Sequence, residues 1–304
     1  MPHEHDHSPG HSQAPINYRK AFAIGVALNV SYVAVEAAFG LFAHSLALVA
    51  DAGHNLSDVV SLLLAWGASR LSQSEPTTRF TYGLRSSTIL ASLVNAIILL
   101  IAIGAIAWEA IRRFHQPQEV SGTLMTAVAS IGVVVNTITA LLFLKGRDTD
   151  LNIKGAFLHM AADAAVSLGV VIAGFAITRT GFQWIDPVTT LIIVAVIAFG
   201  TWSLLRESIN LALLAVPPGI ELREVKNYLA ALPHVTAVHD LHVWPMSTTE
   251  TALTAHLVRS VDYCDTQLLE RTCRELHDRF HIEHATIQFE TEDHNCHLAP
   301  DKRV

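Results

Sequence analysis

Six apolar stretches run through the chain, and each is long enough to cross a lipid bilayer as a helix. A helix needs roughly 20 residues to span the hydrocarbon core, because each residue adds about 1.5 Å of length. Charged residues make up only 15% of the chain, whereas a typical soluble domain has about 25%. We therefore predict a polytopic α-helical membrane protein with six transmembrane helices. The stretches lie at about residues 21–43, 46–69, 86–111, 121–144, 155–178 and 186–206.

The basic residues beside these stretches predict the orientation of the helices, because cytoplasmic loops carry an excess of lysine and arginine. One side of the predicted bundle has Arg112, Arg113 and Arg179. We expect no cleavable signal in residues 1–13, which are polar and rich in histidine. With six spans, both termini are expected on the cytoplasmic side. The membrane is expected to be a bacterial inner (plasma) membrane. The richer, cytoplasmic side has Arg19, Lys20, Arg70, Arg79, Arg85, Lys145, Arg147 and Lys154.

A smaller domain is predicted after the apolar stretches. Hydropathy falls after Arg206, and the Pro217-Pro218-Gly219 sequence is typical of a linker. The remainder is too short to bury a large core alone, so we expect it to pair with a second copy. Its pattern predicts an α/β domain in the order helix 221–232, strand 235–244, strand 251–258, helix 265–280 and strand 285–290. The expected domains are a disordered tail at 1–18, the helical domain at 19–210, the α/β domain at 216–292 and a second tail at 293–304.

Two of the apolar stretches contain the same pair of ionisable residues. The second has His54 and Asp58, and the fifth has His159 and Asp163, four residues apart in each case. This spacing places both side chains of a pair on one face of a helix. Two such helices together offer two imidazoles and two carboxylates, a donor set that suits Zn²⁺ in tetrahedral geometry.

One such pair alone is more often a hydrogen-bonded core pair than a metal site. Two copies favour the metal site, because each would otherwise leave a carboxylate in lipid at a cost of roughly 2.5–3.5 kcal/mol. Four protein ligands leave no open position for a reactive water, and the chain has no HExxH motif. We therefore expect a transporter that carries metal and is not an enzyme.

Three further polar residues are expected near this site. Asp51 lies one turn before His54, where it would orient that imidazole or bind water in a cavity. Asn29 and Glu36 lie seven residues apart in the first stretch and so share a face. They would line a water-filled approach, although an interhelical hydrogen bond explains Asn29 equally well.

Other metal donors lie outside the apolar stretches. Neighbouring strands of the α/β domain are expected to bring together His239, His256 and His284, with Glu290 and Cys296 completing the coordination. The alternative is a set of unrelated surface histidines. Side chains alternate between the two faces of a strand, so we predict that His242 faces away from His239. The N-terminal tail contains four histidines that would capture metal loosely, or it is a solvated tail with no specific role. These are His3, His5, His7 and His11.

The paired HxxxD motifs, the six spans and the stretch His239-Asp240-Leu241-His242-Val243-Trp244 resemble the cation diffusion facilitator family, in its zinc-transporting subgroup. The resemblance covers nearly the whole chain. It implies a homodimer with a metallochaperone-like cytoplasmic domain that binds regulatory zinc. It also implies export of divalent cations in exchange for protons by alternating access around His54, Asp58, His159 and Asp163. Histidine at position 54 implies a preference for Zn²⁺, with Cd²⁺ or Co²⁺ also bound.

The residues themselves support proton exchange, because imidazole binds metal only when neutral and carboxylate only when ionised. A metal sensor that transports nothing is the main alternative, followed by an intramembrane metallohydrolase. A passive channel is disfavoured, since four strong ligands would hold an ion too tightly for rapid conduction. The net charge of −7 offers nothing for nucleic acid binding, and no organic cofactor is expected.

Overall fold

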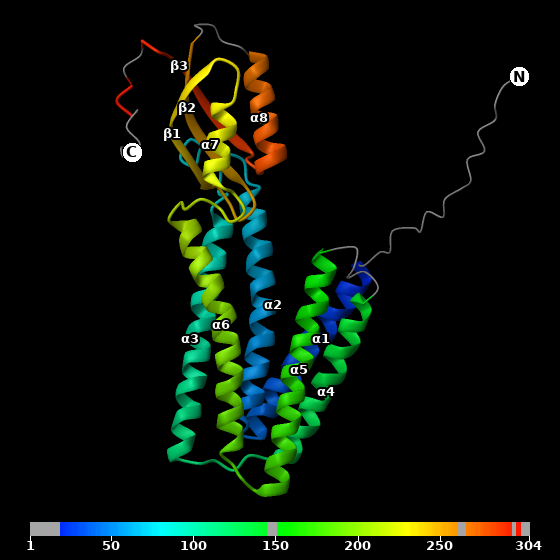
Figure 1. Ribbon diagram of the computed structural model, residues 1–304. Helices are drawn as coiled ribbons and strands as arrows, with labels where there is room; N and C mark the ends of the chain where they lie inside the picture. Colours follow the sequence, from blue (N-terminus) through cyan, green and yellow to red (C-terminus); the bar gives the residue numbers. More distant parts are fainter. Residues whose placement is uncertain (1–18, 145–150, 261–265, 294–295, 299–304) are drawn as a thin grey trace, which may run out of the picture. The chain divides into compact units, whose positions relative to one another are not determined.

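The computed structural model describes residues 19–144, 151–260, 266–293 and 296–298. The first two-thirds of the chain forms long helices (Figure 1), which confirms the predicted helical membrane domain. These are α1 (Arg19–Phe42), α2 (Leu46–Ser72), α3 (Ser87–His115), α4 (Gly122–Phe143), α5 (Leu151–Thr180) and α6 (Ile185–Ala212).

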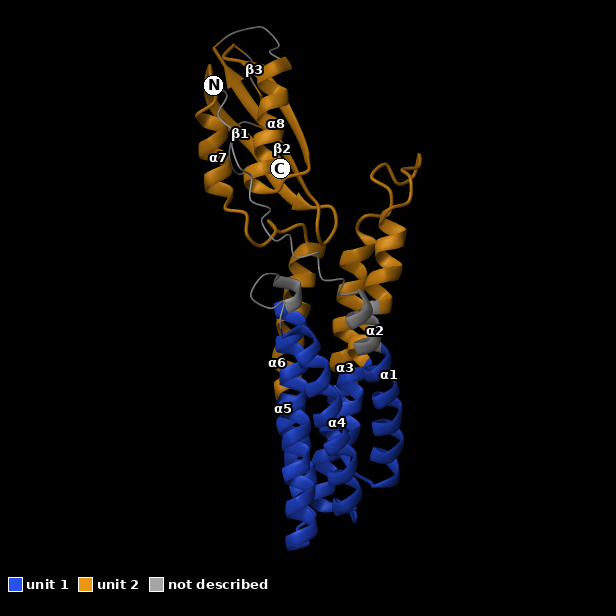
Figure 2. Ribbon diagram, turned by 90° about the vertical axis from the view of Figure 1, so that its right-hand side faces the viewer, with its two compact units in different colours: residues 1–56, 103–195 blue, residues 57–102, 196–304 orange. Residues whose placement is uncertain are grey.

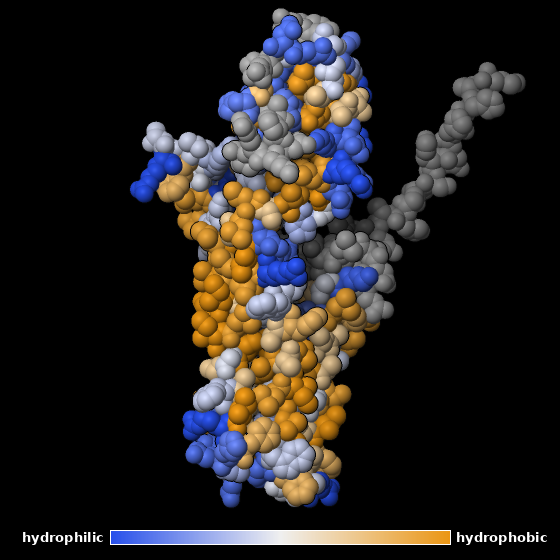
Figure 3. Space-filling view, turned by 60° about the vertical axis from the view of Figure 1, so that its left-hand side comes forward, coloured by the Kyte–Doolittle hydropathy of each residue, from blue (hydrophilic) through white to orange (hydrophobic). Residues whose placement is uncertain are grey.

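Length and hydropathy identify four of the described helices as membrane spans on their own: α3, α4, α5 from Lys154 onward, and α6. The described side chains of α1 add a shorter apolar helix, Ala27–Phe42. Helix α2 is less apolar because it carries Asp51, His54 and Asp58. In the space-filling view of Figure 3, hydrophobic residues cover much of the helical surface, as contact with lipid requires.

The helices and the α/β domain divide into two compact units, coloured in Figure 2. The first unit contains Met1–Leu56 and Ile103–Ala195, and the second contains Ser57–Ala102 and Val196–Val304. In the first unit α4 packs against α1 and α5. The contact with α5 is close because a Cβ added at Gly122 would lie only 2.5 Å from the carbonyl oxygen of Gly174. Small residues permit this approach of two backbones.

A buried carboxylate at the start of α6 holds the first turn of α2. The Oδ1 atom of Asp186 accepts a hydrogen bond from Ser45 Oγ at 2.6 Å, and its Oδ2 atom accepts one from the backbone N–H of Leu46 at 2.9 Å. Arg113 Nη1 lies 3.6 Å from the same Oδ2 atom. Asp186 therefore satisfies backbone donors that the first turn of α2 leaves unpaired.

The α/β domain has the predicted order of elements: α7 (Leu222–Ala230), β1 (Val235–Pro245), β2 (Thr251–Arg259), α8 (Thr266–Phe280) and β3 (His284–Thr291). Strand β2 lies at the centre of the sheet, antiparallel to β1 and parallel to β3. The core contains Val225 and Leu229 from α7, Leu253 and Leu257 from β2, and Leu276 from α8. Since side chains alternate along a strand, the even-numbered residues of β2 lie on the sheet face opposite this core.

Between His239 and His242, strand β1 contains one extra residue relative to β2. His239 pairs with His256 and His242 pairs with Thr254, so three steps along β1 match two along β2. This β-bulge reverses the alternation of β1. The prediction that His242 faces away from His239 is therefore wrong, because Thr254 and His256 share a face of β2.

Candidate metal sites

The first unit brings together three of the four residues in the paired HxxxD motifs. His54 Nε2 lies 3.7 Å from Asp163 Oδ1, and His159 Nε2 lies 3.6 Å from Asp163 Oδ2. The two imidazoles meet edge to face, with ring centroids 6.2 Å apart. The Asp163 carboxylate thus lies between two imidazole nitrogens, in a residue that is only 2% exposed.

These separations are close to those in a metal site. Ligand atoms of a tetrahedral zinc site lie roughly 3.3 Å from one another, because each is about 2.0–2.1 Å from the ion. The side chains of His54 and His159 are partly exposed, at 23% and 42%, so an ion has access to them. Asp58, the fourth residue, is half-buried on α2 one turn beyond His54 and belongs to the second unit.

Two buried carboxylates lie on α1 and α2 of the first unit near these residues. Tyr32 donates a hydrogen bond of 2.7 Å to Glu36 Oε1, and Asn55 donates one of 3.5 Å to Glu36 Oε2. Ser167 Oγ donates to Asp51 Oδ2 at 3.1 Å. Both carboxyl groups are therefore held by neutral donors, which come from α1 itself and from α2 for Glu36 and from α5 for Asp51.

The remaining predicted residue, Asn29, donates a weak hydrogen bond to Met160 Sδ at 3.7 Å, beside His159. Tyr32, Asn55 and Ser167 were not predicted from the sequence. A signal was available for two of them, since Tyr32 lies four residues before Glu36 and Ser167 four after Asp163, each on one helical face.

The α/β domain gathers a second set of donors, from His239, His256, Glu290 and Cys296, with one ligand atom of each within 4.8 Å of the others. His239 Nε2 lies 3.2 Å from Glu290 Oε2, and His256 Nδ1 lies 2.9 Å from Glu290 Oε1. Cys296 Sγ is 3.6 Å from the same His256 nitrogen. Two imidazoles, a carboxylate and a thiol are a donor set that suits Zn²⁺.

The structure does not bring His284 into this cluster. Strand β3 is parallel to β2, so His284 pairs with Ala252 at the far end of the sheet, and Gln288 pairs with His256. The His284 ring instead contacts Tyr82, with ring centroids 5.4 Å apart. The predicted capture residues His3, His5, His7 and His11 lie outside the described residues.

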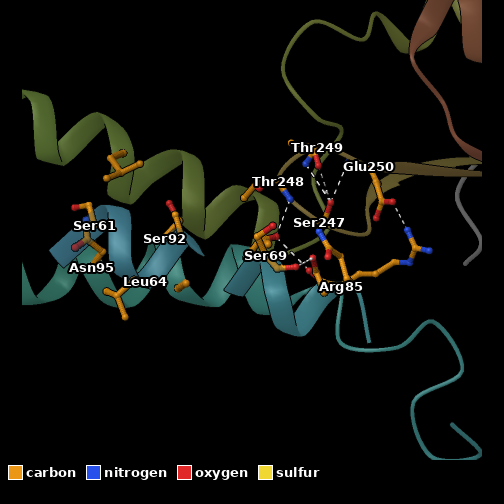
Figure 4. Close-up of a pocket in the computed structure, with 16 residues that line it drawn as sticks. Ser61, Leu64, Ser69, Arg85, Ser92, Asn95, Ser247, Thr248, Thr249 and Glu250 are labelled. Carbon is orange, nitrogen blue, oxygen red and sulfur yellow. Dashed lines mark hydrogen bonds and ion pairs between the residues drawn. The ribbon is translucent and has the colours of Figure 1, made fainter. Parts of the chain in front are cut away.

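The second unit also contains a hydroxyl-lined cavity of about 660 Å³ (Figure 4). It extends along α2, α3 and α6 from Ser61 and Asn95, and reaches the turn between β1 and β2. Arg85 forms an ion pair with Glu250 at this turn. Hydroxyl and amide groups of this kind can hold water or partly hydrated cations. The lining includes Ser61, Ser69, Ser72, Thr88, Ser92, Asn95, Ser247, Thr248 and Thr249.

Comparisons with known proteins agree with these features. The family model for the cation efflux transmembrane domain matches residues 22–211, and the model for the cytoplasmic domain of cation efflux proteins matches residues 217–292. The zinc transporter ZitB of Escherichia coli is 36% identical, over 98% of this chain and 96% of that protein. The metal cation efflux system protein CzcD of Cupriavidus metallidurans is 33% identical, over 95% of this chain and 89% of that protein.

Two further relatives extend the comparison. A cadmium, cobalt and zinc/H(+)-K(+) antiporter of Bacillus velezensis is 32% identical, over 97% of this chain and 94% of that protein. The solved metal-bound C-terminal domain of the C. metallidurans CzcD transporter is 36% identical, over 23% of this chain and 99% of that domain, with a TM-score of 0.22. The chain is therefore a cation efflux transporter, and it belongs to the cation diffusion facilitator family.

Proposed function

We propose that the protein exports divalent cations, chiefly Zn²⁺, from the cytoplasm in exchange for protons. The transport site consists of His54, Asp58, His159 and Asp163, and the protein alternates access to it between the two sides of the membrane. One observation carries the proposal: the buried Asp163 carboxylate lies 3.6–3.7 Å from the imidazole nitrogens of His54 and His159.

The same ligands explain the coupling to protons. An imidazole must lose its proton before it binds metal, so a bound cation and the protons displaced from the site exclude each other. Imidazole is the kind of side chain that gains and loses a proton near neutral pH, which suits it to this exchange. The two carboxylates offset the charge of Zn²⁺ inside the membrane, which lowers the cost of placing the ion there.

The metal range follows from the donor set. Nitrogen and oxygen donors in equal number suit Zn²⁺, and they also accept Co²⁺ and Cd²⁺. The E. coli relative is named a zinc transporter, and the B. velezensis relative a cadmium, cobalt and zinc antiporter. We assign Zn²⁺ as the main substrate and the other two as weaker ones.

The cavity in the second unit supplies an approach for the cation. Its lining begins at Ser61, one turn beyond Asp58 on α2, and ends beside the α/β domain. With both termini and the α/β domain in the cytoplasm, this side of Asp58 is the cytoplasmic side. A hydrated cation would thus approach Asp58 between serine and threonine hydroxyls.

The α/β domain has two roles in this proposal. Its small core favours pairing of residues 216–292 with a second copy, which makes the transporter a homodimer. The cluster of His239, His256, Glu290 and Cys296 binds regulatory Zn²⁺ on the sheet face opposite the core. Residues 1–18 and 293–304 flank these domains as tails, and residues 19–210 form the helical domain.

Zinc uptake by inside-out membrane vesicles tests the transport site. Asp163→Ala removes the shared carboxylate and should abolish uptake, while Glu207→Gln, at an exposed position of α6, should transport like the unsubstituted chain. Uptake that survives Asp163→Ala would exclude this site. Zinc binding without any uptake in the unsubstituted chain would instead favour a metal sensor built on the cytoplasmic cluster.

A further inference from the structure

The bulge in β1 places a strained aspartate beside the cytoplasmic cluster. Asp240 has a φ of +49°, in the left-handed region that side chains other than glycine rarely adopt. Aspartate and asparagine tolerate this conformation best among such residues. Strain of this kind persists only where the surrounding structure enforces it, and it is concentrated at functional sites.

The strained conformation turns the Asp240 carboxylate toward two imidazoles. Its Oδ1 atom lies 3.0 Å from His242 Nε2, and its Oδ2 atom lies 3.5 Å from His256 Nε2. The side chain is only 12% exposed, so water does not compete strongly for these contacts.

His256 therefore has a different partner at each ring nitrogen. Its Nδ1 atom faces the cluster, 2.9 Å from Glu290 Oε1 and 3.6 Å from Cys296 Sγ. A neutral imidazole that binds metal through Nδ1 must carry its proton on Nε2, and this N–H needs an acceptor. Asp240 Oδ2 is placed to be that acceptor.

We propose that Asp240 is a positioning residue for the cytoplasmic metal site: it fixes the His256 ring with its Nδ1 lone pair toward the metal, while His242 anchors the carboxylate. The inference rests on the proposed function of the cluster. It gives a role to the whole stretch from His239 to His242, in which the first histidine is a ligand and the second supports Asp240.

Cobalt binding to the full-length protein tests this role. The thiolate-to-cobalt charge-transfer band reports the cytoplasmic cluster alone, because the proposed transport site contains no sulfur. Cys296→Ser should remove the band, which excludes a contribution from the other cysteines. Asp278→Asn, at an exposed position of α8 in the same domain, should leave it unchanged.

Two substitutions at position 240 keep the left-handed backbone accessible. Asp240→Gly removes the side chain and should weaken Co²⁺ binding, measured from the band, by about 10–100-fold. Asp240→Asn retains an oxygen acceptor but no charge, so it should weaken binding less and shift the d–d spectrum of the bound cobalt. Thermal unfolding of the metal-free protein should be the same for Asp240→Asn as for the unsubstituted chain.

Three results would overturn the inference. Unchanged affinity and spectrum in both variants would leave the metal site intact without a role for Asp240. A loss of affinity accompanied by an equal loss of metal-free stability in Asp240→Asn would make the role merely structural. Absence of the band from the unsubstituted chain would reject the cytoplasmic site itself, whereas zinc uptake that depends on Asp163 would still stand.

Discussion

At the scale of single residues, the proposed function depends on a few ionisable groups held at short distances. Asp163 is shared between two imidazoles in the membrane, and Glu290 is shared between two imidazoles in the α/β domain. In both sites a carboxylate supplies negative charge at the point where a divalent cation would bind. The sites differ in softness, because only the second has a thiol, that of Cys296.

The imidazole of His54 should control the choice of metal. His54→Asp replaces a single nitrogen donor with a carboxylate that can bind through one or two oxygens, so the site is less restricted to the tetrahedral geometry that suits Zn²⁺ and accepts the larger Cd²⁺ more readily. We expect the ratio of Zn²⁺ to Cd²⁺ transport to fall several-fold, measured by competition between the two ions in vesicles. An unchanged ratio would show that His54 does not select the metal.

Two cysteines of the α/β domain should differ in reactivity. Burial raises the pKa of the Cys273 thiol above its usual range, which lowers its reactive thiolate fraction at pH 7. Cys273 should therefore alkylate slowly with or without zinc, and faster as pH rises toward its pKa. Cys296 should be protected only when zinc is present. Mass spectrometry of alkylated peptides measures both rates, and zinc-independent labelling of Cys296 would contradict its role as a ligand.

At the scale of secondary structure, a residue of α6 holds the first turn of α2. Asp186 at the beginning of α6 accepts hydrogen bonds from Ser45 and from the backbone of Leu46 and Ala47, so it caps α2 from a different helix. Helix α2 carries His54 and Asp58. The position of these proposed transport ligands along α2 therefore depends on this cap.

Removal of the cap should destabilise the protein. Asp186→Ala leaves buried donors unpaired, at about 1–3 kcal/mol for each buried group left without a partner. We expect a lower unfolding temperature for the purified protein, with a smaller effect in Asp186→Asn, which keeps one acceptor. Glu119→Ala, at an exposed position, is the matched control. Equal unfolding temperatures for Asp186→Ala and Glu119→Ala would contradict the cap.

Patterns along the chain predict most elements but not the contacts between distant ones. Apolar length predicts the helices, and alternation predicts the strands, because both depend on local spacing. The bulge at Asp240 depends on pairing with β2, so simple alternation misplaced His242. The parallel pairing of β3 with β2, which excludes His284 from the cluster, is likewise a tertiary feature. The cap by Asp186 joins residues about 140 positions apart, beyond the reach of any local pattern.

At the scale of the whole molecule, the second unit joins membrane helices to the α/β domain. Arg85, two residues before α3, pairs with Glu250, and the backbone N–H of Thr248 donates to Thr88 Oγ1 at 3.0 Å. Ser86 Oγ donates to the carbonyl oxygen of Met246. The turn between β1 and β2 is thus held on α3 at the margin of the hydroxyl-lined cavity (Figure 4).

The Arg85–Glu250 pair should affect cation flux. Glu250→Gln leaves the Arg85 cation unpaired beside the cavity, where it repels an approaching divalent cation. We expect zinc uptake to slow several-fold at low ionic strength and to recover partly in salt, which screens the charge. Exchange of the two charges, in Arg85→Glu with Glu250→Arg, should restore uptake. Slow uptake whose rate does not depend on ionic strength would contradict this electrostatic effect.

The central claim is that Zn²⁺ and protons compete for His54, Asp58, His159 and Asp163 and therefore move in opposite directions. The most direct test reconstitutes the protein in liposomes that enclose a pH-sensitive dye, with equal pH on both sides and zinc added outside. The account predicts that zinc uptake alkalinises the lumen as protons leave, and that Asp163→Ala abolishes both movements. Zinc uptake without any change of internal pH, under conditions where the dye responds to added acid, would contradict the exchange mechanism.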